Sequence, residues 1–284
     1  AGPNGLGLCC ERLSQLLQIF THRGRGVTDL RLRWVIGMAL LGLSLSIVTR
    51  HAHSSSERPL IIAVAANFAE PAEQLVASFT EKTGVPVRLV IGSTGLLYAQ
   101  ITQGAPIDLF LAADIDRPRA LIAKNLATEQ SFAVYARGRL VLWVPGIPGP
   151  PIPADFMTAF ESVALANPLL APYGRAASEV LARFPKKSEH LRLVRGQNIS
   201  ATYTQIASGA VPGGFVALGQ VLAQGVPRVE YAMIPQEWHE PIEQALVLIK
   251  GEERHPAGQE FRHFLLSENV SVMLKSLGYL AVGG

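Results

Sequence analysis

Leu60-Ile-Ile-Ala-Val-Ala65 is an unbroken apolar run, and the small-residue turn Ala66-Asn67-Phe68 follows it directly. The length and β-branched content of the run are typical of a strand that is buried on both faces. An amphipathic stretch from Pro71 to Lys82 comes next, and Gly84 ends it as a helix C-terminal glycine. This order of strand, turn and helix predicts one unit of a parallel sheet covered by helices.

The same alternation of short apolar runs and amphipathic stretches continues along the rest of the chain. Further strands are expected at 87–91, 109–111, 140–144, 163–165, 191–194, 215–218 and 244–249. Further helices are expected at 94–103, 117–124, 173–184, 199–207, 258–266 and 270–277. The proline-rich segment 145–153 is predicted to lack regular structure. We therefore predict an α/β fold with mixed, mostly parallel sheets flanked by helices.

Charge is distributed unevenly between the start of the chain and the remainder. The formal net charge is +3, but residues 1–53 contain six arginines against two acidic residues. From Ser54 onward, 19 basic side chains face 20 acidic ones, so the net charge of this part is −1. A nucleic-acid-binding protein with a basic face is therefore not supported, and we expect no nucleic-acid partner.

The segment Trp34–Val48 is an uncharged apolar run of 15 residues that follows two arginines. It is shorter than the roughly 20 residues of a membrane-spanning helix, and its positive flank is typical of a secretory signal. We expect export to the periplasm or another extracytoplasmic space. Arg50, His51 and His53 stand where small residues would favour cleavage, so an uncleaved anchor remains an alternative.

The residues before this run contain no Met, since Met38 is the first in the chain. We expect translation to begin at Val27 through a non-standard start codon. Cys9 and Cys10 are the only cysteines and lack a preceding apolar run, which argues against lipid attachment. The absence of thiols after them excludes disulfides, cysteine zinc sites and cysteine nucleophiles from the main part of the chain.

Two junctions between a strand and a helix carry side chains that can donate hydrogen bonds to an anion. In parallel α/β sheets, ligands collect at such junctions because helix N-termini present free N–H groups and a partial positive charge. The first junction carries Asn67, and the second is Gly92-Ser93-Thr94-Gly95. These residues form an anion-binding pattern, although each is equally an ordinary N-cap by its type and position.

The second half of the chain supplies two more junctions, Ala171-Pro-Tyr-Gly174 and Gly196-Gln-Asn-Ile-Ser200. Tyr173 offers a phenolic hydroxyl, and Ile199 offers its backbone N–H at the start of a helix. A packing role for Tyr173 and a capping role for Asn198 are the alternatives. Arg175 adjoins the first of these junctions, and we expect it to point to solvent.

Catalysis is the main competing function. The chain beyond residue 53 has four histidines, none with a spacing typical of a metal site: His190, His239, His255 and His263. Asp114 and Asp116 suit a cation, but helix capping explains them more simply. Neither a Gly-x-Ser-x-Gly elbow nor a P-loop is present. We therefore predict no enzyme, no catalytic residue, no cofactor and no bound metal cation, and a hydrolase remains the less supported alternative.

Seven motifs in order, spread over residues 59–282, resemble those of the periplasmic molybdate/tungstate-binding proteins of ABC importers. They are Ala63–Phe68, Phe79–Gly84, Gly92–Gly95, Gln103–Pro106, Asp108–Asp114, Ala171–Gly174 and Gly214–Leu218. The resemblance implies a two-lobed periplasmic-binding fold with a hinge of two crossing strands and the ligand in the cleft. Lobe one would combine residues 59–138 and 233–284, and lobe two would comprise residues 139–232.

The resemblance also implies a set of ligand contacts, with molybdenum or tungsten present only as its oxyanion. The contacts would be Ala66 through its backbone, Asn67, Ser93, Thr94, Tyr173 and the backbone N–H of Ile199. One branch of the family uses a tyrosine in a strand of the second lobe, where this chain has Ala217. The chain therefore resembles the other branch, in which an asparagine of the first loop and the tyrosine of the Ala-Pro-Tyr-Gly loop take part.

The resemblance thus implies an exported, monomeric receptor that captures molybdate or tungstate and delivers it to the membrane permease of an ABC importer and its ATPase. A receptor for sulfate, phosphate or another small anion has the same fold and remains an alternative. Molybdate and tungstate have nearly equal size and charge, so the sequence does not distinguish between them.

Overall fold

The computed structural model describes residues 58–147, 153–251 and 254–282, which all belong to one compact unit, residues 57–284. The predictions of an export signal, of a start at Val27 and of no lipid attachment at Cys9 and Cys10 concern residues outside these ranges. Within the described ranges, no helix has the length and apolar character needed to span a bilayer.

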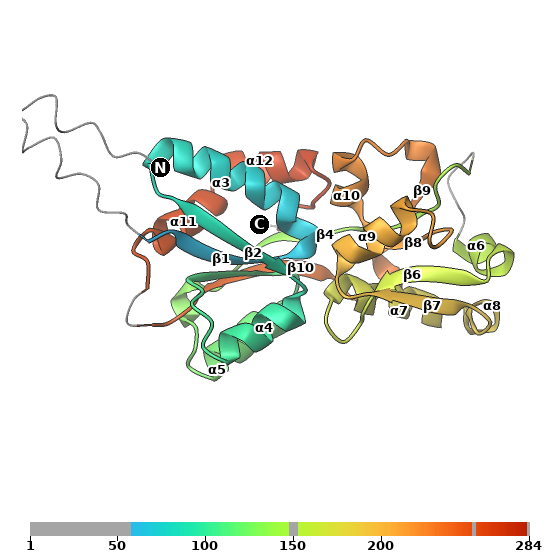
Figure 1. Ribbon diagram of the computed structural model, residues 1–284, viewed down its shortest axis with the longest axis horizontal. Coiled ribbons are helices and arrows are strands. Elements are labelled where there is room, and N and C mark those ends of the chain that lie inside the picture. Colours follow the sequence, from blue (N-terminus) through green and yellow to red (C-terminus); the bar gives the residue numbers. More distant parts are fainter. Residues whose placement is uncertain (1–57, 148–152, 252–253, 283–284) are drawn as a thin grey trace, which may run out of the picture. The chain divides into compact units, whose positions relative to one another are not determined.

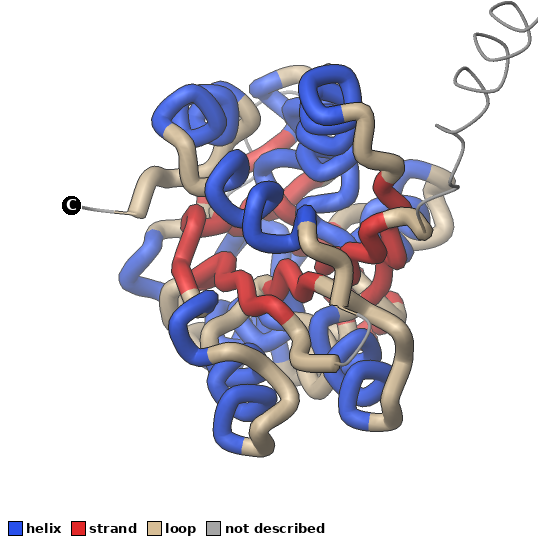
Figure 2. Tube along the Cα trace, turned by 90° about the vertical axis from the view of Figure 1, so that its left-hand side faces the viewer, coloured by secondary structure: helices blue, strands red, loops and turns tan. Residues whose placement is uncertain are grey.

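The first of two sheets has five strands in the order β2-β1-β3-β10-β4. Its strands are β1 (Leu60–Ala65), β2 (Val87–Gly92), β3 (Leu109–Ala112), β4 (Ala133–Gly138) and β10 (Ile242–Leu248). β1 is parallel to β2 and β3, whereas β10 is antiparallel to β3 and β4. Helices cover both faces of this sheet (Figure 1): α3 (Ala69–Thr83), α11 (Ala257–Leu265) and α12 (Glu268–Ser276) on one, α4 (Thr94–Thr102) and α5 (Asp116–Ala123) on the other. Figure 2 shows the strands lying between layers of helices.

The second sheet also has five strands, in the order β7-β6-β8-β5-β9. Its strands are β5 (Leu140–Trp143), β6 (Ser162–Ala166), β7 (Arg192–Gly196), β8 (Gly214–Ala217) and β9 (Tyr231–Met233). β6 is parallel to β7 and β8, and β5 is antiparallel to β8 and β9. The helices of this half are α6 (Pro153–Ala159), α7 (Pro172–Ala182), α8 (Pro185–Ser188), α9 (Ile199–Ala207) and α10 (Leu218–Ala223).

Short 3-10 helices connect these elements: η1 (Ala66–Phe68), η2 (Glu129–Ser131), η3 (Arg228–Glu230) and η4 (Gln236–Trp238). Two cores lie on opposite faces of the second sheet, one against α6 and α7 and the other against α9 and α10. The first sheet is likewise packed on both faces. Each half of the protein is therefore a three-layered α/β structure, and the predicted fold class is confirmed.

The chain passes between the two sheets twice. β4 ends at Gly138 in the first sheet, and β5 begins at Leu140 in the second. The chain returns between Met233, the last residue of β9, and Ile242, the first of β10. The predicted division into two lobes remains a proposal about which parts move together. Because β9 belongs to the second sheet, however, the return lies after Met233 and not at the predicted residue 233.

The structure differs from the predicted elements at several places. β4, β9 and α8 were not predicted. The sequence of β4, Ala-Val-Tyr-Ala-Arg-Gly, hides its strand pattern because its burial alternates only in part. α6 begins at Pro153, inside the segment predicted to be irregular, because a proline in the first helical turn loses no hydrogen bond. Leu218 was predicted to end a strand but begins α10. β1 and α9 have the predicted bounds.

The buried carboxylate of Asp108 connects several segments at one end of the first sheet. Asp108 is 3% exposed, and its two oxygens accept hydrogen bonds from Arg58 at 2.7 and 2.8 Å. The backbone N–H groups of Ile61 and His255 donate to the same carboxylate at 2.8 and 2.9 Å. Burial acts to raise the pKa of Asp108, but Arg58 and the two N–H groups outweigh it, so the pKa is lowered.

Replacing Asp108 by Asn is expected to lower the free energy of unfolding at pH 7 by about 1.5 to 3 kcal/mol, the range for hydrogen bonds to a charged group. Because the folded pKa is lowered, this contribution is present above the unfolded pKa of about 3.9 and is lost as the pH falls below it. Urea unfolding followed by circular dichroism should show the gap between wild type and variant narrowing from about pH 5 to pH 3.

Glu161→Gln is the matched control, because Glu161 is exposed. Its free energy of unfolding should stay close to that of the wild type at each pH. A gap between wild type and Asp108→Asn that is constant with pH would contradict the assigned pKa shift.

Candidate functional site

All six residues selected from the sequence line one cavity between the two lobes. Ala66, Asn67, Ser93 and Thr94 come from the first lobe, and Tyr173 and Ile199 come from the second. The other lining residues are Ala65, Ala113, Ala171, Pro172 and Asn198, so the described lining contains no charged side chain. The cavity is small, with a volume of about 10 Å³, which is about the space of one water molecule.

Four helix starts surround this cavity. The turn η1 leads from β1 into α3, and α4 starts at Thr94 after β2. From the other lobe, α7 starts at Pro172 after β6, and α9 starts at Ile199 after β7. Each start presents backbone N–H groups without intrahelical partners and the positive end of a helix dipole. The cavity therefore favours an anion, although none of its side chains carries a positive charge.

The lobe-one hydroxyls are free to donate into the cavity. Ser93 is the N-cap of α4 by position, yet its side chain makes no capping hydrogen bond. Thr94 accepts a hydrogen bond at Oγ1 from the N–H of Ala113 at 3.2 Å, which leaves its own proton for another acceptor. Both side chains are buried. The capping alternative for these two residues therefore does not account for their hydroxyl protons.

The start of α9 is arranged differently. Asn198 caps the helix as expected, because its Oδ1 accepts a hydrogen bond from the N–H of Ala201 at 2.9 Å. This cap leaves the N–H groups of Ile199 and Ser200, which belong to the first turn and have no intrahelical acceptor. Ile199 is 3% exposed and lines the cavity. Its N–H is therefore the available backbone donor of this helix.

Tyr173 is 2% exposed, and its hydroxyl lies against Gly138, the last residue of β4. A Cβ added at Gly138 would lie 2.0 Å from the tyrosine oxygen, so only glycine leaves room for it. Burial, and then the nearby hydroxyls of Tyr279 and Tyr135, raise the pKa of Tyr173 well above its ordinary value. Hydrogen bonds with Asn67 and the backbone of Arg139 oppose the rise. Tyr173 is thus a neutral hydrogen-bond donor at any physiological pH.

Asn67 makes contacts that the sequence did not predict. It does not cap a helix, and its Nδ2 donates to Oε1 of Gln244 at 2.9 Å and to the hydroxyl of Tyr279 at 3.4 Å. Tyr279 in turn donates to the backbone carbonyl of Asn67 at 2.7 Å. Gln244 had a local signal, since it is a polar residue within the apolar strand 242–248, whereas Tyr279 had none.

Direct contacts between the lobes flank the cavity on one side. The N–H of Gly95 donates to the carbonyl of Leu170 at 2.8 Å, and Arg117 Nη2 donates to the carbonyl of Leu169 at 2.9 Å. Asp114 holds the guanidinium of Arg117 through an ion pair. A Cβ at Gly95 would lie 3.0 Å from the Cα of Leu170, so the small residue allows this approach.

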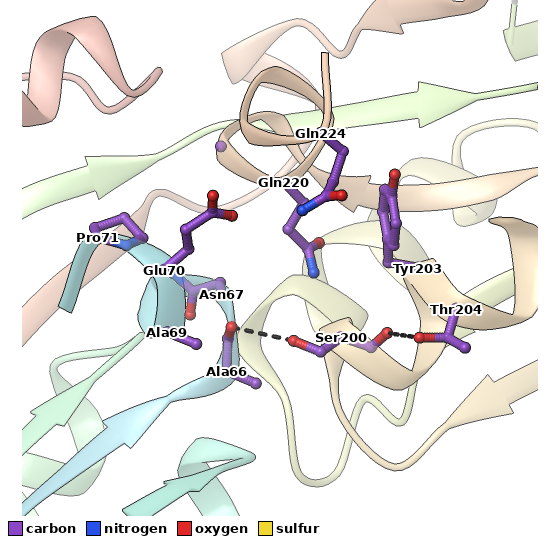
Figure 3. A pocket seen from close by; sticks show the side chains of 11 residues that line it. Ala66, Asn67, Ala69, Glu70, Pro71, Ser200, Tyr203, Thr204, Gln220 and Gln224 are labelled. Atoms are coloured by element: carbon purple, nitrogen blue, oxygen red, sulfur yellow. Dashed lines mark hydrogen bonds between the residues drawn. The ribbon is translucent and has the colours of Figure 1, made fainter. Parts of the chain in front are cut away.

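Two further contacts cross the cleft. Ser200 donates from Oγ to the carbonyl of Ala66 at 3.2 Å, as Figure 3 shows. Arg175 forms an ion pair with Asp116 at 3.3 Å at the surface, and its side chain is exposed, as predicted, and does not line the cavity. Sequence reasoning also missed Ser200, because a serine in the first turn of a helix has no signal for a partner 134 residues away.

The other cavities suit a small anion less well. A cavity of about 200 Å³ beside Ser200 contains the carboxylate of Glu70 (Figure 3), and one of about 370 Å³ has five acidic side chains. A third, of about 490 Å³, contains Arg58, Lys250 and Arg254, but it lies wholly in lobe one at the far end of β1. Among the described residues, no group of three His, Cys, Asp or Glu side chains could hold a metal ion.

Known proteins share this sequence and fold. A family described as bacterial extracellular solute-binding protein matches residues 60–280. The chain is 38% identical over 243 residues to the molybdate-binding protein ModA of Rhodobacter capsulatus, covering 84% of this chain and 94% of that protein. It is 36% identical to ModA of Azotobacter vinelandii, covering 77% and 88%. The solved structure of the Azotobacter vinelandii periplasmic molybdate-binding protein superposes with a TM-score of 0.73 at 31% identity, covering 79% of this chain and 100% of that one.

Replacing Gly138 by Ala is expected to lower the free energy of unfolding by about 1 to 3 kcal/mol, because the added methyl overlaps the Tyr173 hydroxyl. Gly251→Ala is the matched control, since a Cβ there meets nothing within 4 Å. Chemical unfolding of both variants measures the difference. Equal stability of the two variants would contradict the placement of the Tyr173 hydroxyl against Gly138 of β4.

Proposed function

Because the chain belongs to the bacterial extracellular solute-binding proteins, we propose that it captures molybdate outside the cytoplasm and delivers it to the membrane permease of an ABC importer. The observation that carries the proposal is the uncharged cavity, which is surrounded by hydrogen-bond donors from both lobes. Relatives at 36% and 38% identity are molybdate-binding proteins. The relatives are binding proteins and not enzymes, so molybdate is cargo and not a cofactor.

The donors suit a tetrahedral dianion. Ser93, Thr94 and Tyr173 supply hydroxyls, and the helix starts at Ala66 and Ile199 supply backbone N–H groups. Neutral donors at helix ends stabilise a dianion without the cost of burying a lysine or arginine beside it. Each buried donor left without an acceptor costs about 1 to 3 kcal/mol. Selection between molybdate and the smaller sulfate ion would then depend on the size of the closed cavity, because an ion that leaves some of the donors unpaired binds less favourably. Tungstate has nearly the same size and charge as molybdate, and we expect it to bind as well.

Closure of the lobes would follow from this arrangement. A ligand that contacts Thr94 in lobe one and Tyr173 in lobe two stabilises the conformation in which both lobes reach it. The contacts of Leu169 and Leu170 with lobe one belong to the same conformation. We propose that the permease, which works with its ATPase, recognises this closed form, and that the protein acts as a monomer. Export through the apolar segment 34–48 remains a prediction.

Micromolar molybdate is expected to raise the melting temperature, since a ligand at about 100 times its Kd adds about 2.7 kcal/mol to the free energy of unfolding. Calorimetric titration with molybdate and with sulfate gives the two affinities. Equal affinity for both ions would refute the selectivity. A protein that binds neither ion would refute the function.

Thr94→Ala and Tyr173→Phe are each expected to weaken molybdate binding about two- to tenfold, because each removes one neutral hydrogen-bond donor. Tyr98→Phe, in the same helix as Thr94, is the control, because Tyr98 does not line the cavity. Titration calorimetry measures the three affinities. If both site variants bind as tightly as Tyr98→Phe, neither hydroxyl contacts the ion.

Ser200→Ala tests closure, because it removes the hydrogen bond from Ser200 to Ala66 between the lobes and leaves the cavity lining intact. We expect molybdate to dissociate about two- to tenfold faster. Ser208→Ala, at the end of the same helix, removes a hydrogen bond that stays within lobe two. Stopped-flow measurement should show that Ser208→Ala releases molybdate at the wild-type rate, and equal rates for both variants would contradict a role for Ser200 in closure.

A further inference from the structure

We propose that Gln244 and Tyr279 are positioning residues of the anion site, which fix the turn and the amide of Asn67 beside the hydroxyl of Tyr173. The assignment rests on the proposed function, because it concerns the affinity and selectivity of the same site. Neither residue lines the cavity, and both lie far from Asn67 in sequence, 177 and 212 residues away.

Hydrogen bonds hold Asn67 on both its side chain and its backbone. Its Nδ2 donates to Gln244 at 2.9 Å and to Tyr279 at 3.4 Å, and its carbonyl accepts from Tyr279 at 2.7 Å. Asn67 lies in the middle of the turn η1, and its side chain can rotate about two torsions unless a contact holds it. These contacts fix both the turn and the amide, so the neighbouring N–H groups have one direction into the cavity.

Gln244 is placed by an irregularity of the first sheet. The register of β10 against β4 shifts between Gln244 and Ala245, so that Gln244 lies opposite Ala136, Ala245 lies opposite Val134, and Tyr135 is the extra residue. Such a bulge redirects side chains beside it. The side chain of Gln244 is completely buried, and its Nε2 donates to the carbonyl of Ile242 at 3.3 Å. Its Oε1 is thereby directed towards Asn67.

The segment that follows α12 places Tyr279, because it contacts both β4 and α10. Gly278 has a φ of +89°, which a glycine adopts without strain and which turns the chain after α12. Leu280 then forms an isolated antiparallel bridge with Arg137 of β4, in which the N–H of each residue donates to the carbonyl of the other at 2.9 Å. A Cβ at Gly219, in α10 of lobe two, would come within 3.4 Å of the Tyr279 ring.

The network lies beside Tyr173 of the second lobe. A Cβ at Gly138 would lie 2.0 Å from the Tyr173 hydroxyl oxygen and 3.1 Å from Nε2 of Gln244, and Tyr173 lines the cavity together with Asn67. All four side chains are at least nine-tenths buried. In such surroundings a hydrogen bond is strengthened by its neighbours, and the loss of one member loosens the others. The lobe-two hydroxyl therefore lies directly beside the lobe-one side chains that fix Asn67.

Tyr135 provides a matched control for Tyr279. Both rings pack edge-on against Phe68, with centroids 5.0 and 5.4 Å away, and both are buried. The hydroxyl of Tyr135 has no hydrogen-bond partner among the described residues, whereas that of Tyr279 contacts Asn67 twice. Tyr135→Phe and Tyr279→Phe thus remove the same atom from the same core, and only the second removes a contact with Asn67.

The experiment titrates molybdate and sulfate into wild type, Tyr279→Phe, Tyr135→Phe, Gln244→Met, Asn67→Ala and the double variant Asn67→Ala/Gln244→Met, with melting temperatures recorded without ligand. We expect Tyr279→Phe and Gln244→Met to weaken molybdate binding about three- to tenfold and to reduce its preference over sulfate, while Tyr135→Phe binds like wild type. In the Asn67→Ala background, Gln244→Met should cause no further loss, because Gln244 contacts Asn67 only through the side chain that this background removes.

Each of the other outcomes would contradict one part of the proposal. Lower melting temperatures with unchanged affinity and selectivity would make Gln244 and Tyr279 purely structural and overturn the positioning role. A loss of affinity by Gln244→Met that persists in the Asn67→Ala background would overturn the route through Asn67. If wild type binds neither ion, the proposed function fails and this assignment fails with it; if wild type binds molybdate and Tyr279→Phe matches Tyr135→Phe, only the assignment fails.

Discussion

Every donor buried between the lobes must meet an acceptor, because an unpaired buried polar group costs about 1 to 3 kcal/mol. The architecture follows from this constraint. Four helices start at the carboxyl ends of strands, two in each lobe, so that their free N–H groups converge on one small space. No charged side chain lines that space, and the attraction for an anion comes from dipoles that are fixed in the backbone. Recognition therefore depends on the distance between the lobes more than on any single residue.

The lobes come this close because glycines stand at the points where they meet. Gly95 lets its own N–H reach the carbonyl of Leu170 at 2.8 Å, and Gly138 leaves room for the Tyr173 hydroxyl beside the crossing strand. Arg117, which is anchored by Asp114, adds a hydrogen bond to the carbonyl of Leu169. These contacts are to backbone atoms and have little tolerance for displacement. They define the geometry that, in our proposal, a ligand contacting both lobes would stabilise.

The sequence predicted the parts of this design that are local. Strand ends, helix starts and the donors Ser93, Thr94 and Ile199 follow from short motifs, because capping and hydrophobic periodicity act over a few residues. It did not predict β4, whose mixed burial hides its pattern. The partners of Asn67 were also missed, because contacts over 177 and 212 residues depend on the tertiary fold. Asn67 lines the cavity, and its contact with the anion stays a prediction, because its side chain is bound within lobe one.

In the proposed site, two classes of residue together determine which anion binds. The first class donates into the cavity, and its members lie at helix starts, where almost any chain of this fold places a donor. The second class, formed by Gln244 and Tyr279 around Asn67, fixes where those donors point. A donor free to move by half an ångström would follow a smaller ion and lose the difference between the two ions. Discrimination between anions of equal charge therefore requires the second class, and it explains why completely buried polar side chains persist in the core behind an uncharged site.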